Sequence, residues 1–244
     1  MDEQAKATLI SVARCADLLT ASDRQRPCHR IVHEQHGNPV PQIPEPWRGR
    51  IDAPLMFVSS NPSLDPGDDS PSVTVSDAEL VDYFDRGFPA CFPRIRLRNG
   101  QVRTRPVYFW TCVLARAAEL WQVAPRPGID FAITELVHCK SLRQRGVKEA
   151  IDHCVDRHWG EVKIASKARV FVALGELAGA KLGIKVGTMK TMPDPTGVPR
   201  WLLALPHPGA AVPKTFQSCY AGVDLVPLRD ALLANRISDA DPQP

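Results

Sequence analysis

Short apolar runs alternate with segments of helical periodicity along this chain, and this alternation limits the folds open to it. Four runs have the length and composition of buried strands: 54–58, 129–138, 168–174 and 200–205. Apolar residues recur at helical spacing in the segments around them: 4–20, 77–86, 107–122, 147–164, 175–182 and 223–236. Strands that alternate with helices predict an α/β fold built on a central, mostly parallel sheet.

Two of these strands are followed directly by a polar residue next to proline. Asn61 and Pro62 come after the first strand, and His207 and Pro208 come after the last one. In a parallel sheet, ligands bind at the carboxyl ends of the strands. We therefore expect Asn61 and His207 to meet in one cleft, although they lie far apart in the sequence.

The length and composition are those of an ordinary globular chain. Its 244 residues are 44% hydrophobic and 23% charged, which suffices for one sizeable core. We expect one domain over 1–244. In it, an N-terminal helix and an extended segment (1–50) pack on the core, and residues 238–244 form a frayed tail.

The sequence shows no signal for a membrane or for secretion. No apolar run approaches the roughly 18 residues that a membrane-spanning helix needs. The first residues include Asp2 and Glu3 and lack the pattern of a signal peptide. We expect a cytoplasmic monomer without membrane contacts.

Basic residues concentrate in two segments, although the formal net charge is only +3. Five arginines lie within 94–105, and the segment 140–148 contains Lys140 and Arg143. Clusters of this kind suit the phosphate groups of a nucleic acid, which makes Lys140 and Arg143 candidate contacts. The alternative is that each cluster is a solvated loop.

Five short motifs resemble, in their order along the chain, the uracil-DNA glycosylase superfamily. The first-strand motif G-x-N-P-G corresponds to SSNPS at 59–63, and the H-P-S or H-P-A motif corresponds to PHPG at 206–209. Three further segments are similar to the iron–sulfur branches: CHRIV at 28–32, ITELVHCK at 133–140 and VFVALG at 170–175. The resemblance covers roughly residues 28–236.

The resemblance implies a three-layer α/β/α fold with a four-stranded sheet. It also implies an enzyme that flips a pyrimidine out of DNA and hydrolyses its N-glycosidic bond. Asn61 would position the attacking water, and His207 would donate a hydrogen bond to O2 of the leaving base.

Further residues of the chain take base and DNA contacts under the same resemblance. The loop after His207 would enter the minor groove with Val212 as its wedge. It would contact DNA through Pro208, Gly209 and Lys214. Ser60, in the first motif, would lie against the base, and a phenylalanine would stack on it, with Phe92 favoured over Phe88.

Two residues depart from the family pattern in ways that bear on the substrate. Glu135 stands where the family has an asparagine that reads the uracil edge. A carboxylate repels uracil O4 but accepts from cytosine N4, and a protonated carboxyl also donates to N3. The alternative is that Glu135 turns away, or stays neutral and mimics the amide. Ser63 replaces the tyrosine with which the uracil-specific enzymes exclude substituents at C5 of the base, so it leaves that side open.

Four of the seven cysteines suggest a metal site. Cys139 and Cys154, with 14 residues between them, resemble paired ligands of the iron–sulfur branches, and Cys28 resembles a third. The fourth family ligand is missing, and Cys15 is the substitute that we expect. These thiolates would hold a structural four-iron–four-sulfur cluster.

Two alternatives to this cluster stay open. One is a zinc site formed by Cys28 with His29, His33 or His36. The other is a set of reduced core cysteines without any metal.

We therefore expect a monofunctional DNA glycosylase. Because removal of ordinary cytosine would destroy the host's own genome, the favoured substrate is a 5-substituted cytosine, such as the hydroxymethylated or glucosylated bases of some phage DNA. The first alternative is a uracil-DNA glycosylase in base-excision repair. The others are a non-catalytic module that binds modified or abasic DNA, and an RNA or nucleotide hydrolase on the same scaffold.

Overall fold

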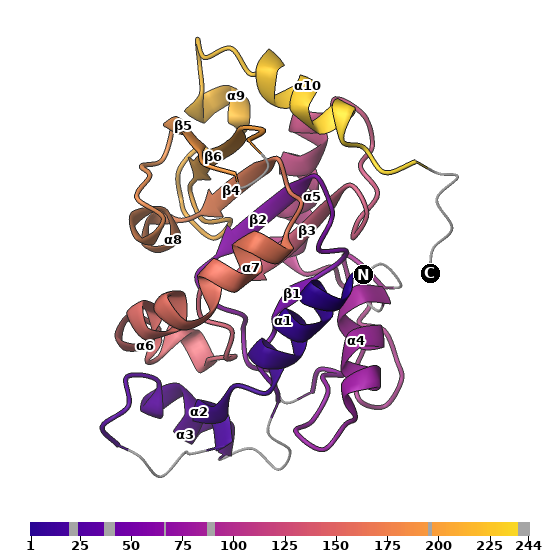
Figure 1. Cartoon of the computed structure of the whole chain (residues 1–244), viewed down its shortest axis with the longest axis vertical. Helices are drawn as coiled ribbons and strands as arrows, with labels where there is room; N and C mark the ends of the chain where they lie inside the picture. Colours follow the sequence, from indigo (N-terminus) through magenta and orange to yellow (C-terminus); the bar gives the residue numbers. More distant parts are fainter. Residues whose placement is uncertain (20–23, 37–41, 66, 87–90, 195–196, 239–244) are drawn as a thin grey trace.

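One six-stranded sheet organises the chain in the computed structural model, which describes residues 1–19, 24–36, 42–65, 67–86, 91–194 and 197–238 (Figure 1). The strands lie in the order β1-β3-β2-β4-β6-β5. The four central strands run parallel: β3 (Phe131–Glu135), β2 (Leu55–Ser59), β4 (Val170–Leu174) and β6 (Arg200–Leu205). This confirms the predicted α/β fold and all four predicted strands.

The sheet has six strands rather than the four expected, because an antiparallel strand is added at each edge. These are β1 (Trp47–Arg48) beside β3 and β5 (Met189–Met192) beside β6. Neither carries a clear strand signal. β1 has only two residues. In β5, the two end residues are half-buried and the two central residues are exposed. A short or polar edge strand is a common protection against further pairing.

Alternate residues of the strands supply two separate cores, one on each face of the sheet. In β2, Met56 and Val58 belong to one core, whereas Leu55 and Phe57 belong to the other. This follows from the period of two along a strand. All four side chains are fully buried, so the sheet is covered on both faces and the fold has three layers.

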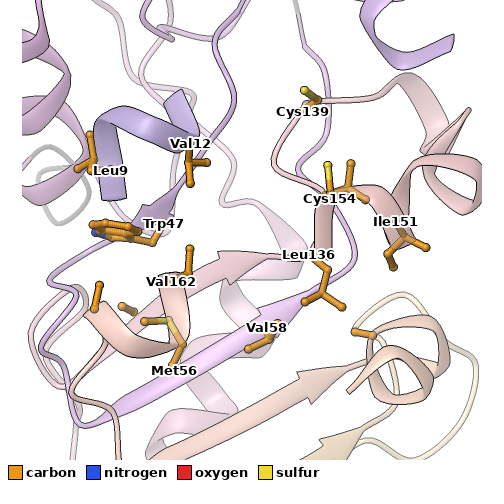
Figure 2. Packing of buried hydrophobic residues seen from close by; sticks show 14 of the residues in the cluster. Leu9, Val12, Trp47, Met56, Val58, Leu136, Cys139, Ile151, Cys154 and Val162 are labelled. Carbon is orange, nitrogen blue, oxygen red and sulfur yellow. The ribbon is translucent and has the colours of Figure 1, made fainter. Parts of the chain in front are cut away.

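Helices from different parts of the chain cover each face. The core that contains Met56 is closed by α1 (Glu3–Ala13), α4 (Asp77–Arg86), α6 (Val147–Cys154), α7 (Gly160–Ala165) and α8 (Glu176–Lys181). Figure 2 shows Leu9, Val12 and Trp47 packed near Val162 and Met56 in this core. The opposite core is closed by α5 (Tyr108–Trp121), α9 (Phe216–Cys219) and α10 (Val226–Ala234).

The N-terminal region is more structured than the expected helix followed by an extended segment. The helix predicted at 4–20 breaks at Arg14 and Cys15 into α1 and the short α2 (Ala16–Leu19). A further helix, α3 (His29–His36), follows. The helix predicted at 147–164 is continuous, since α6 passes through a π-helical turn (Val155–Trp159) into α7. The tail expected at 238–244 lies outside the described residues except for Ser238.

Candidate active site

A cavity of about 460 Å³ opens at the carboxyl ends of the parallel strands. This volume lies within the range of about 300–1,000 Å³ that is typical of small-molecule sites. Asn61, just beyond β2, and His207, just beyond β6, both line it. The structure therefore brings together the two residues that the sequence predicted to share a cleft.

The side chain of Asn61 is held by its amide nitrogen. Nδ2 donates to Oγ of Ser141 at 2.7 Å and to the carbonyl of Pro62 at 2.8 Å. Because the Pro62 carbonyl can only accept, the amide orientation is fixed. Among the described residues, the amide oxygen has only the Ser60 hydroxyl near it, at 3.5 Å. The oxygen is thus available as an acceptor for a water molecule in the cavity.

His207 is held with one ring nitrogen engaged. Its Nδ1 accepts a hydrogen bond from the backbone N–H of Gly209 at 3.0 Å. Burial, assisted by the positive charge of Lys214, lowers the pKa of the imidazole, which favours the neutral ring. In a neutral ring whose Nδ1 accepts, Nε2 carries the proton. His207 is therefore a hydrogen-bond donor.

Close approach fixes the position of His207 as well. A Cβ atom at Gly175 would lie 3.1 Å from Cβ of His207, and Gly175 has a φ of +96°. Glycine is suited to both conditions because it has no side chain and tolerates positive φ. On another side, the ring of Phe109 lies 5.7 Å from the His207 ring, centroid to centroid.

Glu135 does not turn away from the site; it is buried and lines the cavity. It is the last residue of β3, opposite Ser59 at the end of β2, and Oγ of Ser59 donates to its Oε2. Burial and the neighbouring Glu45 raise the pKa of Glu135 to about 8, against the opposing effects of Ser59 and Arg48. The carboxyl group is therefore mostly protonated near pH 7, and it offers a donor as well as an acceptor.

A buried ion network lies beside Glu135. Arg48 Nη2 lies 2.5 Å from Oε1 of Glu45, and Lys140 Nζ lies 2.7 Å from the same oxygen. Burial alone would raise the pKa of Glu45, but these two cations hold it well below its usual range. A charge this deeply buried is tolerated because it is paired and hydrogen-bonded.

The structure corrects the expectation that Lys140 contacts DNA. Lys140 is 1% exposed, and its Nζ donates to Ser70 Oγ at 3.0 Å in addition to its Glu45 partner. An amine enclosed in this way cannot reach a phosphate backbone. Arg143, by contrast, is exposed at the edge of the cavity, where its φ of 51° marks a sharp bend of the chain.

The loop after His207 combines internal bonds with an exposed tip. The Lys214 ammonium donates to the carbonyl oxygens of Pro208 and Ala210, and it also contacts the Tyr108 hydroxyl. Lys214 thus closes the loop upon itself rather than projecting as a free cation. Val212 is exposed, as a wedge residue would have to be.

Of the two phenylalanines predicted to stack on the base, only Phe92 is described. Phe92 is not among the described residues that line the cavity; it stacks on Trp110, with ring centroids 5.7 Å apart, and packs into the core behind it. Trp110 and Phe109, on the first turn of α5, line the cavity instead. Phe88 lies outside the described residues.

Ser59 and Ser60 of the first motif are consecutive at the end of β2, so their side chains point in opposite directions. Ser59 lines the cavity and meets Glu135, whereas Ser60 is buried and does not belong to the described lining. The expected contact of Ser60 with a base stays a prediction, while Ser59 is the first-motif serine nearest Glu135. Ser63 lines the cavity and is exposed, so its side of the site is open.

The four cysteines that the sequence singled out converge beside the core of α6 and α7. All four are buried, and Figure 2 shows Cys139 and Cys154 in one region of the core. Burial is the main cause of the raised pKa of each thiol, and every pair among the four is close enough to interact electrostatically. Thiols are the ligands that iron–sulfur clusters and zinc take in proteins, and a bound metal would reverse the pKa shift.

A second candidate metal group adjoins these thiols. Single ligand atoms of Asp17, Cys28 and His153 lie within 4.8 Å of one another. His153 Nε2 is 2.7 Å from Oδ2 of Asp17. The histidine in this group is therefore His153; of the expected histidines, neither His29 nor His33 belongs to it. The side chain of His36 is outside the described part of the chain.

Several site residues carried no signal that singled them out. Ser141 and Glu45 act through contacts with residues far away in the sequence, Asn61 and Lys140. Arg48 pairs locally with Glu45, and both lie in a proline-rich segment that resembled a linker. Phe109 and Trp110 were part of a helix pattern that indicated only burial. Lys140 lies two positions beyond the predicted second strand, and its positive charge led to the prediction that it contacts DNA.

Two comparisons with known proteins found no match. No protein-family model matches the sequence, and no curated protein matches it significantly. In the part of the chain that is described, no helix has both the length and the apolar character needed to cross a bilayer.

Because Lys140 is buried and Arg143 is exposed, their replacement should affect the stability of the fold very differently. Lys140→Met should destabilise the fold by on the order of 3 kcal/mol, because it removes a cation from the buried Glu45 carboxylate. Arg143→Met, at an exposed position, should change stability by less than about 0.5 kcal/mol. Urea denaturation of both variants measures this difference. A Lys140→Met variant as stable as the wild type would refute the structural role of the lysine.

Proposed function

We propose that this protein is a monofunctional DNA glycosylase of the uracil-DNA glycosylase type, acting on a flipped-out pyrimidine. The observation that carries the proposal is the fixed polarity of two side chains in one cavity: the Asn61 amide oxygen is an available acceptor, and His207 Nε2 is a donor. A hydrolytic water is oriented by an acceptor such as the Asn61 oxygen. A departing base that gains negative charge is stabilised by a donor such as His207 Nε2.

In the proposed reaction, the Asn61 amide oxygen accepts a hydrogen bond from the attacking water. The water oxygen forms a bond to C1′ of the deoxyribose while the C1′–N bond breaks, and the bonding electron pair leaves with the base. The proton lost by the water ends on the base. An amide is a poor base, so Asn61 acts by orienting the water, and the products are a free base and an abasic site.

His207 stabilises the leaving group in this scheme. A neutral imidazole donates its Nε2–H to pyrimidine O2, where negative charge develops as the glycosidic bond breaks. The lowered pKa of His207 supports this role, because the ring needs no proton transfer in order to donate. Hydrolysis is favoured over lyase chemistry, since the amines of Lys140 and Lys214 are both held by hydrogen bonds to protein oxygens.

The favoured substrate is a cytosine that carries a substituent at C5, with hydroxymethyl and glucosylated hydroxymethyl groups as examples. Because Ser59 bonds to Oε2 of Glu135, the proposal places the acid proton on Oε1. A donor there matches N3 of cytosine, which accepts, and the other carboxyl oxygen accepts from N4. The open side at Ser63 accommodates the substituent. Uracil excision in repair is the alternative, because a neutral carboxyl group can also imitate the family amide.

DNA is the proposed partner, and the exposed rim supplies its contacts. Arg143 lies at the cavity edge, and Arg96 lines the same cavity from the opposite segment. Both are exposed, as phosphate contacts must be. Val212, at the tip of the loop that Lys214 closes, would fill the gap left by the flipped base.

We assign Cys15, Cys28, Cys139 and Cys154 to a structural four-iron–four-sulfur cluster, with zinc as the alternative metal. Such a cluster, when bound, links α6 to the N-terminal segment and to the loop after β3. Hydrolysis of an N-glycosidic bond transfers no electrons, so these thiolates serve the fold and not the reaction.

Asn61→Ala should abolish base release while preserving DNA binding. The expected loss is at least about 100-fold, since orientation of the water is lost. Release of free base is measured by mass spectrometry on oligonucleotides that contain uracil, hydroxymethylcytosine or glucosylated hydroxymethylcytosine, and DNA binding is measured by fluorescence anisotropy. The exposed Asn99→Ala variant is the matched control. If the wild type binds these DNAs and releases no base from any of them, the protein is a binding module.

Base release should decline as the pH rises through about 8, because Glu135 then loses the proton with which it contacts the base. Below this pKa the carboxyl is neutral and the contact is complete. Glu135→Gln keeps a donor and an acceptor but cannot ionise, so its pH–rate profile should lack this decline. Single-turnover rates between pH 6 and pH 9 make the comparison. Identical pH–rate profiles for the wild type and the Glu135→Gln variant would refute a role of Glu135 in base recognition.

The raised pKa of Glu135 also has a consequence for stability. A carboxyl group whose folded pKa is raised from 4.5 to about 8 stabilises the fold fully below the unfolded pKa, and this contribution is lost as the pH rises through the folded pKa. Between pH 4.5 and about pH 8, the free energy of unfolding of the Glu135→Gln variant should therefore fall less than that of the wild type.

Protein purified without oxygen should be brown and contain iron and acid-labile sulfide. Replacing Cys15 by serine should reduce the iron content, because this thiol lies within electrostatic range of the other three. Cys112→Ser, outside the cluster, is the control. Zinc in place of iron would support the alternative metal, and full iron occupancy in the Cys15→Ser variant would exclude this cysteine as a ligand.

A further inference from the structure

A second cavity, of about 640 Å³, lies directly beside the active-site cavity. Four residues line both: Ser63, Asp68, Ile95 and Val107. The rest of the second cavity is formed by the segment 97–106 and by Asp65. It therefore begins on the side of the active site where Ser63 leaves C5 of a bound pyrimidine uncovered.

The wall of the second cavity combines apolar residues, among them Leu97 and Val102, with charged groups whose charges balance. Asp65 and Asp68 face Arg103 and Arg105, together with Gln101 and Thr104. Two carboxylates and two guanidinium groups give no net charge. A mixed wall without net charge suits a neutral group that carries both hydroxyls and apolar C–H faces, as a sugar does.

The junction between the cavities holds a carboxylate oxygen with unused bonding capacity. Oδ1 of Asp68 is buried and accepts no hydrogen bond from any described residue, although Nη2 of Arg103 lies 3.4 Å from it. The side chain of Asp68 is 13% exposed. Leaving a buried acceptor unsatisfied costs about 1–3 kcal/mol, so such an atom calls for a ligand.

The neighbouring carboxylate differs in this respect. Oδ1 of Asp65 accepts from the backbone N–H of Gly67 at 2.8 Å, and its Oδ2 pairs with Arg103. Both oxygens of Asp65 are thus already engaged within the protein. Of the two acids, Asp68 is the one that remains able to accept from a ligand.

We propose that the second cavity is a binding site for a neutral, polyhydroxylated substituent carried on C5 of the base, and that Asp68 determines specificity by accepting a hydrogen bond from one of its hydroxyls. This rests on the proposed glycosylase function and deepens it. The substituent passes Ser63, occupies the space lined by the 97–106 segment, and presents a hydroxyl to the Asp68 carboxylate. The ligand class is a base-linked sugar.

The test is a ratio of two release rates, for glucosylated hydroxymethylcytosine and for hydroxymethylcytosine in the same oligonucleotide. Asp68→Asn removes the charged acceptor and should lower this ratio roughly tenfold or more. Thr104→Trp, which fills the second cavity from a residue that does not line the first, should lower it as well. Asp82→Asn, at an exposed aspartate that is not in the described lining of either cavity, is the control, and it should leave the ratio unchanged.

The outcomes separate this inference from the proposed function. Unchanged ratios in both Asp68→Asn and Thr104→Trp, in a protein whose wild type releases both bases, would overturn the second cavity as the substituent site and leave the glycosylase intact. A wild type that releases no base would refute the glycosylase and this inference together. Thermal unfolding of each variant establishes that the compared proteins are folded.

Discussion

The parallel pairing of β3, β2, β4 and β6 is the constraint on which the candidate site depends. It places the carboxyl ends of the four strands along one edge, and the register sets Ser59 of β2 against Glu135 of β3. Asn61 and His207 each follow a strand end by two residues. Both are tied by hydrogen bonds to their own loops, so rigid elements rather than flexible segments determine the geometry of the cavity.

Buried charge gives the cavity its second property. The network of Arg48, Glu45 and Lys140 keeps one carboxylate ionised, and that charge helps to keep Glu135 neutral beside it. Paired titratable groups with opposite pKa shifts are a known mark of functional sites. The same network closes one side of the cavity, while Ser63 and Asp68 lead into the second cavity on another side.

The parts of the fold that the sequence predicted are those that local pattern determines. The buried strands are continuous apolar runs of a length that leaves few alternatives, and the polar residues after β2 and β6 follow from strand ends. Ser141 and Asp68 could not be predicted, because their roles depend on contacts across the fold. Lys140 was misjudged, since a lysine in a basic segment gives no indication of a buried partner such as Glu45. Phe92 was expected to line the cavity, but Trp110, on which it stacks, lines the cavity instead.

The central claim is that this chain breaks the bond between a base and its sugar, and the products test it most directly. The wild-type protein is incubated with DNA that contains a glucosylated hydroxymethylcytosine, and all released species are identified by mass. The account predicts an intact modified base, with its sugar still attached, and an abasic site in an unbroken strand. Free sugar, a released nucleotide, or an enzyme–DNA adduct trapped by borohydride would contradict it.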